Sequence, residues 1–122
     1  MFEQKAPGTM TDLAEIEQRV LAELEELWEE NVFAMLNTII DPTGAIEEVA
    51  LLVEALRGLI ERDYVVLGFE SFSPREPEML EKEASLDLAS KLGDWLKFDR
   101  TDRNWTLSKG DIKKERIPVI YS

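Results

Sequence analysis

The 122-residue sequence contains neither cysteine nor histidine. The lack of cysteine excludes a disulfide framework and thiolate chemistry. The lack of histidine removes the commonest general acid or base, the commonest metal ligand and the side chain that usually titrates near neutral pH. Because zinc sites almost always use one of these two residue types, we expect no zinc site.

Long apolar runs are also missing. No stretch of about 18 apolar residues occurs, so we expect no membrane-spanning helix. Residues 1–10, MFEQKAPGTM, have one lysine and no apolar core of the kind that a secretory signal needs. We expect them to form a short flexible leader, with translation from Met10 as an open alternative, and we expect residues 11–122 to form one globular domain in the cytoplasm.

Charge is plentiful but uneven. The chain has 26 Asp and Glu against 14 Lys and Arg, a net charge of −12. Residues 91–122 hold eight of the basic residues and five acids, so that segment carries +3 and residues 1–90 carry −15. The acidic part would repel a polyanion, whereas the C-terminal quarter could attract one locally.

Residues 12–30 have the pattern of an amphipathic helix. Thr11 is the expected N-cap, and Asp12 suits the first turn, where the helix dipole favours an acid. The apolar side chains recur at spacings of three and four, close to a heptad repeat. Such a stripe can pack on a second copy in a homodimer or within the monomer, and both arrangements are open. The residues of this stripe are Leu13, Ile16, Val20, Leu24 and Leu27.

Further elements follow along the chain. Residues 31–40 are apolar on most sides and predict a buried helix. A breaker at 41–44, DPTG, precedes a strong amphipathic helix over 45–62, and 64–69 are typical of a strand. A third helix is expected from Glu76 or Pro77 to about Leu92. Its apolar positions are four apart, at Leu80, Ala84, Leu88 and Leu92.

The C-terminal part predicts strands. Residues 95–100 and 104–108 form an expected hairpin with a turn at 101–103. Residues 117–121 are apolar, but Pro118 cannot donate to a ladder, so we expect an edge strand there. The predicted fold is therefore α+β and predominantly helical, with three to four helices and a small antiparallel sheet.

Two phrases resemble those of winged-helix domains. EALRGLIERDYVVL (54–67) resembles the passage from a recognition helix into the first wing strand, and NWTLSKGD (104–111) is similar to the phrase that often closes the wing. The resemblance implies a helix–turn–helix over 31–62 and a wing at 95–108. It also implies DNA binding, often as a dimer through an extra N-terminal helix. The residues implied to contact DNA are Arg57 and Arg62 from the helix and Lys97, Arg100 and Arg103 from the wing.

The charge of the expected recognition helix opposes this activity. Helix 45–62 carries four glutamates against two arginines. A helix that reads DNA normally brings positive charge, since affinity rests largely on counterion release. On the expected hairpin, Lys97, Arg100, Arg103 and Lys109 are interleaved with acids, which suits an acidic protein surface better than a duplex.

The side chains that could carry chemistry form no catalytic pattern. Within ELEELWEE (23–30), Glu25 and Glu29 are four apart, as are Glu26 and Glu30, so these pairs could hold a hard cation on one helix face. A solvated face is favoured, because helical carboxylate metal sites usually include histidine. No serine has a histidine to activate it, and the glycines form no phosphate-binding loop. We expect no catalytic residues, no metal and no cofactor.

The aromatic residues divide between core and surface. We expect at least one of Trp95 and Trp105 in the core, together with Phe69 and Phe98, because aromatic side chains on strands usually pack inward. Phe72, in a proline-rich loop, is the better candidate for an exposed contact.

The sequence thus predicts a small, non-catalytic, acidic interaction or regulatory domain that is winged-helix-like and homodimeric, with an unknown protein partner. The alternative is a winged-helix transcriptional regulator that binds DNA. The predicted interaction or nucleic-acid surface consists of Arg57, Arg62, Phe72, Lys97, Arg100, Arg103 and Lys109.

Overall fold

The computed structural model describes residues 12–71, 77–108 and 116–122. The leader at 1–10, the expected cap Thr11, and Phe72 and Lys109 of the predicted surface lie outside these residues. The α-helices are α1 (Leu13–Leu27), α2 (Val32–Ile39), α3 (Ile46–Glu61) and α4 (Lys82–Ser90), and a 3₁₀ helix, η1, spans Leu92–Trp95. The strands are β1 (Glu29–Asn31), β2 (Val66–Ser71), β3 (Pro77–Met79), β4 (Leu96–Asp99), β5 (Asn104–Leu107) and β6 (Arg116–Tyr121).

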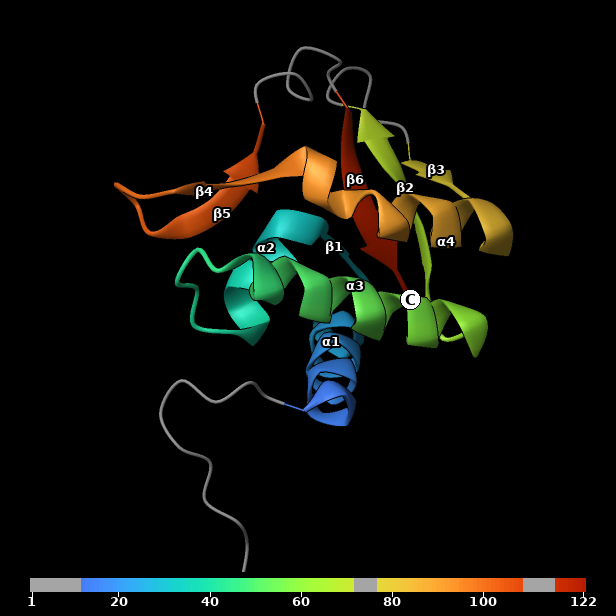
Figure 1. The fold of residues 1–122 in the computed structure, drawn as a ribbon. Coiled ribbons are helices and arrows are strands. Elements are labelled where there is room, and N and C mark those ends of the chain that lie inside the picture. The colour runs from blue at the N-terminus through green and yellow to red at the C-terminus, as the bar shows by residue number, and fades with distance from the viewer. Residues whose placement is uncertain (1–11, 72–76, 109–115) are drawn as a thin grey trace, which may run out of the picture.

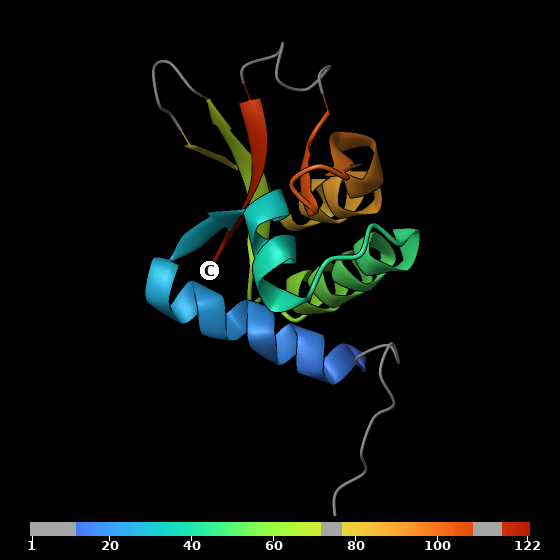
Figure 2. The ribbon, with the colours of Figure 1, turned by 90° about the vertical axis from the view of Figure 1, so that its left-hand side faces the viewer.

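Four strands form one antiparallel sheet in the order β1-β6-β2-β3, and β4 and β5 form a separate two-stranded hairpin. Helices α2, α3 and α4 lie on one side of the sheet, and α1 runs beneath one end of it (Figures 1 and 2). The α+β class, the four helices and the small antiparallel sheet agree with the prediction. None of the described helices is long and apolar enough to cross a bilayer.

The apolar stripe of α1 packs inside the chain. Ile16, Val20 and Leu24 are almost completely buried in the core, whereas Leu13 and Leu27 at the two ends are exposed. Of the two arrangements that the sequence left open, the structure shows packing within the monomer for the three central residues. The helix begins after Asp12, whose carboxylate accepts a hydrogen bond from the Glu15 N–H at 3.1 Å.

The predicted helix over 12–30 is too long. Helix α1 ends at Leu27, Trp28 has a φ of 69°, and the next three residues form β1. Strand β1 forms because Glu29–Asn31 pair with Val119–Tyr121 of β6. These two segments are far apart in the sequence, so local periodicity does not predict their pairing. Asn31 then caps α2 by accepting from the Ala34 N–H at 2.8 Å.

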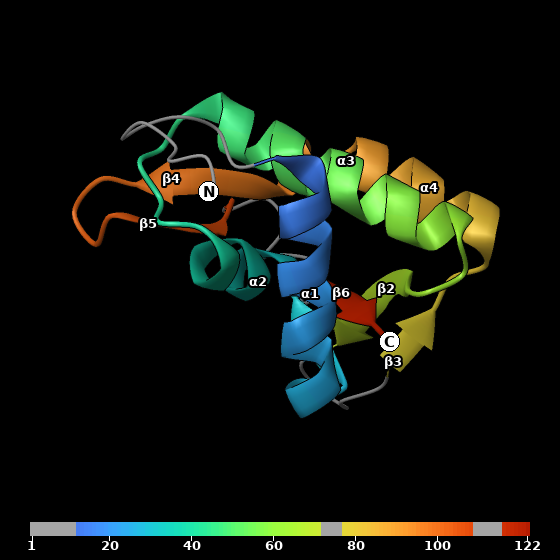
Figure 3. The same cartoon turned by 90° about the horizontal axis from the view of Figure 1, so that it is seen from below.

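Helices α2 and α3 confirm the predicted segments 31–40 and 45–62. The core side of α2 consists of Val32, Met35, Leu36 and Ile39, and that of α3 of Val49, Leu52, Ala55, Leu56, Leu59 and Ile60. Ile46, the first residue of α3, is exposed. Figure 3 shows α4 alongside α3, and both α4 and η1 pack on that helix.

The expectation of an edge strand at 117–121 is wrong. Strand β6 lies between β1 and β2, and it pairs with β2 along its whole length. Pro118 is tolerated because β1 pairs only with Val119–Tyr121, so the proline lies one residue beyond that ladder.

The predicted start of the third helix at 76 or 77 is also wrong. Residues 77–79 form β3 against β2, and the Leu80 N–H donates to the Leu67 carbonyl at 2.9 Å. The helix runs only from Lys82 to Ser90, and its buried positions are Ser85, Leu88 and Ala89. Ala84, expected inside, is exposed, because the buried side of α4 is formed by Ser85, Leu88 and Ala89.

Candidate functional site

The two arginines predicted to face DNA are exposed, and each is bonded to a neighbouring helix of the same chain. Arg62 forms an ion pair with Glu17 of α1 at 2.6 Å, and this hydrogen bond raises the pKa of Arg62 above its ordinary value. Its Nε also donates to the Gly58 carbonyl. Arg57 donates to the Ser90 hydroxyl of α4 at 3.3 Å. Both side chains therefore link α3 to a neighbouring helix.

The outward side of α3 is acidic. Glu47, Glu54 and Glu61 are exposed at intervals of seven residues, and Ala50 and Arg57 are the other exposed positions between them. Residues seven apart lie close to one line along a helix, so the three carboxylates share that side. This surface presents negative charge where a DNA-reading helix would present positive charge.

The predicted basic hairpin is present, and its three described basic residues are exposed. Lys97 is on β4, and Arg100 and Arg103 are in the turn between β4 and β5. The turn is held by Asp99, whose carboxylate accepts from the Thr101 and Asp102 N–H groups at 2.9 and 3.2 Å. The hairpin thus projects positive charge from a rigid turn.

The inner face of the hairpin is aromatic. Phe98 lies opposite Trp105, and their rings meet edge to face with centroids 5.4 Å apart. Trp105 is buried, which agrees with the prediction that at least one tryptophan of this region is in the core. Trp95 lies in η1 rather than on a strand, and its ring is 5.4 Å from that of the half-buried Phe69.

Two polar side chains attach the hairpin to the helices, and sequence analysis found neither. The Asn37 amide of α2 donates to the Trp105 carbonyl at 2.9 Å and accepts from the Trp105 N–H at 2.8 Å. Glu48 of α3 accepts from the indole Nε1–H of Trp105 at 3.0 Å. The same carboxylate accepts from the Thr43 hydroxyl at 2.7 Å and from the backbone N–H groups of Thr43 and Gly44.

The pKa of Glu48 reflects this environment. Partial burial raises it, but the hydrogen bonds from Thr43, Trp105 and Gly44 outweigh burial, so the pKa lies below its ordinary value of 4.5. A carboxyl whose pKa is lower in the folded state stabilises the fold at pH values above 4.5, and that stabilisation is lost as the pH falls through the folded-state value.

Glu48→Gln should lower the free energy of unfolding by about 1 kcal/mol at neutral pH, since a charged acceptor is replaced by a neutral one on a partly exposed residue. Urea unfolding of both proteins between pH 7 and pH 3 measures the difference. It should stay constant down to about pH 5 and shrink below pH 4.5. A difference that does not depend on pH would contradict this role of the ionised carboxylate.

The predicted carboxylate pairs do not share a helix face. Glu25 and Glu26 are on α1, but Glu29 and Glu30 are on β1 because the helix ends at Leu27. Glu30 accepts from the adjacent Asn31 N–H at 3.0 Å. Within residues 12–71, 77–108 and 116–122, no three acidic side chains gather in a way that could hold a metal ion.

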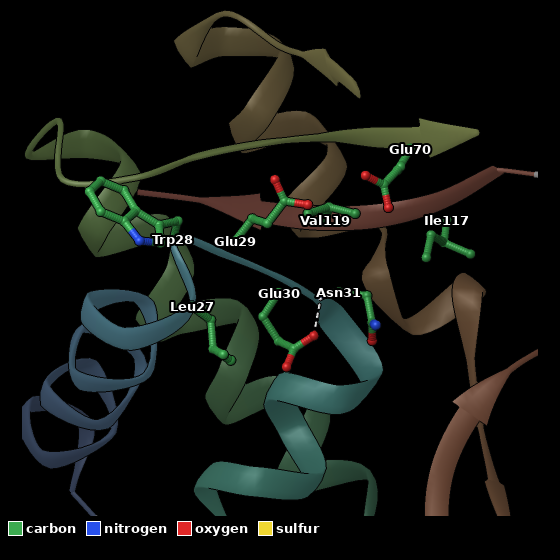
Figure 4. Close-up of a pocket in the computed structure, with 8 residues that line it drawn as sticks. All are labelled: Leu27, Trp28, Glu29, Glu30, Asn31, Glu70, Ile117 and Val119. Atoms are coloured by element: carbon green, nitrogen blue, oxygen red, sulfur yellow. Dashed lines mark hydrogen bonds between the residues drawn. The ribbon is translucent and has the colours of Figure 1, made fainter. Parts of the chain in front are cut away.

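Trp28 is a surface feature that the sequence analysis did not single out. Its side chain is 76% exposed, and it borders two shallow hollows of about 520 and 550 Å³. The first hollow lies on the face of the sheet opposite the helices (Figure 4). It is lined by Leu27, Trp28, Glu29, Glu30, Asn31, Glu70, Ile117 and Val119.

Comparison of the chain with family profiles, curated proteins and solved structures finds no match. The function is therefore argued from the surfaces of this chain.

Proposed function

We propose that this chain is a non-catalytic protein-interaction domain built on a winged-helix-like core. The observation that carries the proposal is the charge of the exposed side of α3, which presents Glu47, Glu54 and Glu61. This acidic helix favours a protein partner over a nucleic acid. The lack of histidine and cysteine supports the non-catalytic part of the proposal.

The order and pairing of the elements support the winged-helix-like core. Helices α2 and α3, joined by residues 40–45, lead into β2, which pairs with β6, and β6 also pairs with β1. Residues 95–108, the implied wing, correspond to the β4–β5 hairpin, which forms a separate two-stranded sheet and, within the described residues, does not pair with β2. Strand β3, α4 and η1 come between β2 and this hairpin. The fold alone implies no activity.

Packing on α3 also favours a protein partner. Helix α4 lies alongside α3, and Arg57 donates to Ser90 of α4. A recognition helix that enters a major groove needs its outward face and its basic side chains available for the duplex. Here Arg57 and Arg62 bridge to α4 and α1 instead.

The predicted homodimer needs a surface other than the central stripe of α1. Ile16, Val20 and Leu24 are buried in the core of the single chain. Exposing them to a second copy would require α1 to leave the sheet and α3. A dimer therefore stays a prediction, and its interface would lie elsewhere.

One observation favours the alternative, a DNA-binding regulator. Lys97, Arg100 and Arg103 are all exposed on one hairpin. A rigid basic hairpin can contact phosphates even when the rest of the protein is acidic. The test is therefore direct binding to duplex DNA.

The purified protein should show no binding to a mixed-sequence duplex at low ionic strength in fluorescence anisotropy, because the acidic body opposes approach. Binding that weakens steeply with salt would contradict the proposal. In that case the hairpin assignment predicts loss of binding in Arg100→Glu/Arg103→Glu. The matched control is Lys82→Glu/Lys91→Glu, which makes the same change in net charge at the first residue and the C-cap of α4, outside the hairpin strands and turn.

A further inference from the structure

Trp28 occupies a backbone position that does not suit it. Its φ of 69° lies in the left-handed region, which glycine adopts readily and a tryptophan does not. Two backbone hydrogen bonds fix it there: the Trp28 N–H donates to the Leu24 carbonyl at 2.8 Å, and the Trp28 carbonyl accepts from the Ser122 N–H at 3.1 Å. The chain thus holds a bulky aromatic residue at a helix end where glycine would be the less strained choice.

Burial does not explain the choice of tryptophan. The side chain is 76% exposed, so most of its apolar surface remains in water. Leu27 beside it is 46% exposed. Large exposed aromatic residues that gain little inside their own chain are typical anchors of protein interfaces.

The surroundings of Trp28 provide apolar contact area. On one side the first hollow is lined by the exposed Leu27 and the partly exposed Ile117. On the other side, over α1, the second hollow is lined by the partly exposed Leu21 and the exposed Ala22. Figure 4 shows Trp28 at one end of the first hollow, with Val119 on the sheet between Glu29 and Glu70. An apolar side chain from a partner would therefore lie against aliphatic groups next to an indole.

The charge around Trp28 has one sign. Glu30 lines the first hollow and Glu25 lines the second, and none of the described lysines or arginines lines either. The C-terminal end of α1, at Leu27, adds the partial negative charge of the helix dipole. A cation would meet carboxylates, helix carbonyls and the face of an indole at this site.

We propose that Trp28 anchors a docking surface for a protein segment in which a large apolar residue is flanked by lysine or arginine. The inference rests on the proposed protein-interaction function and specifies its partner. The apolar residue lies over Leu27, and a basic side chain stacks on the Trp28 indole with its charge toward Glu25 or Glu30. Contact with the indole and charge complementarity together make this surface favour basic, apolar segments.

Other occupants fit less well. Duplex DNA would bring phosphates to a surface lined by carboxylates. The hairpin of a second copy carries the basic residues Lys97, Arg100 and Arg103, but its aromatic residues Phe98 and Trp105 face its own core and cannot fill an apolar hollow. A segment of a separate partner protein can supply both the apolar residue and the basic side chain.

Selection from a random 12-residue peptide library displayed on phage tests the proposal, with the immobilised protein as target. Enriched peptides should combine two or more Lys or Arg with an aromatic or branched aliphatic residue. Their affinity, measured by isothermal titration calorimetry with synthetic peptides, should weaken as salt is raised from about 0.1 to about 1 M, since the charges are solvent-exposed.

Three variants test whether Trp28 contributes to peptide binding independently of its effect on the stability of the fold. Trp28→Gly relaxes the backbone at φ 69°, so its Tm should equal or exceed that of the wild type, while peptide affinity falls at least about tenfold, as expected for a hot-spot residue. Tyr64→Ala, which removes another exposed aromatic side chain, is the matched control and should keep full affinity. Glu25→Lys, on the rim of the second hollow, should weaken binding and reduce its salt dependence.

The outcomes distinguish the two proposals. Basic, apolar peptides that bind Trp28→Gly as tightly as the wild type would overturn the Trp28 site and leave the protein-interaction function standing. Enrichment of acidic peptides would also overturn the site. A dimer of the wild type that becomes monomeric in Trp28→Gly would show a second copy as the occupant and contradict the partner chemistry. Failure to enrich any peptide, together with salt-dependent binding of duplex DNA, would overturn both.

Discussion

Replacing Gly68 with alanine should lower the free energy of unfolding by about 3 kcal/mol. Gly68 lies in the middle of the sheet, on β2, and pairs with Met79 of β3 and Val119 of β6. A Cβ atom at this position would overlap the backbone oxygen of Glu78 and would approach the Met79 Cα to 3.0 Å. These are backbone atoms of a paired strand, so relief requires β3 to move away from β2 rather than a side chain to rotate.

Gly93→Ala is the matched control for this substitution. Gly93 lies in η1, and no atom lies within 4 Å of the position that its Cβ would occupy. Chemical unfolding followed by circular dichroism should therefore show little change for Gly93→Ala and a large loss for Gly68→Ala. Equal stabilities of the two variants would contradict the close approach of β3 to β2.

Val20→Asp should unfold the protein or lower the free energy of unfolding by about 4 kcal/mol or more. Val20 is completely buried in the middle of α1, among the residues of the core. A carboxylate there would lose its hydration without a partner, and small domains have only about 5–15 kcal/mol of stability in total.

The same substitution separates the two arrangements that the heptad-like stripe left open. If the stripe packed on a second copy, Val20→Asp would give a folded monomer. Circular dichroism with sedimentation analysis measures both properties. Leu13→Asp, at the exposed first residue of α1, is the control and should leave both the fold and the mass in solution unchanged, because an acid is favoured in the first helical turn.

The local sequence was enough to predict α2 and α3. Residues 31–40 are apolar on most sides, 45–62 have an amphipathic pattern, and the breaker at 41–44 separates them. The hairpin was also predictable, because β-branched and aromatic residues flank a polar turn. In these elements the residues that determine the secondary structure are close together in the sequence.

The short strands could not be predicted in the same way. Strands β1 and β3 have three residues each, too few for a periodic signal, and each exists because a distant strand pairs with it. Pro118 was interpreted as an edge residue, although the sequence does not reveal how far β1 extends along β6. Element boundaries in this chain therefore depend on long-range pairing more than on local propensity.

The candidate sites divide in a similar way. The exposure of Lys97, Arg100 and Arg103 followed from their place at a polar turn. The hydrogen bond from Arg57 to Ser90 joins residues 33 positions apart, and the one from Asn37 to Trp105 joins residues 68 positions apart. The local sequence gives no signal for either bond. Trp28 lies inside the predicted helix 12–30, and its place at the surface became visible only because α1 ends one residue before it.

Partners of this chain should bind at Trp28 rather than at the hairpin or α3. The most direct test is a titration of ¹⁵N-labelled protein with the tightest peptide from the library, followed by two-dimensional NMR. We expect the largest shifts at the indole N–H of Trp28 and at the backbone N–H groups of Glu29 and Val119. Shifts concentrated instead on the hairpin residues 97–106 or on α3 would contradict it.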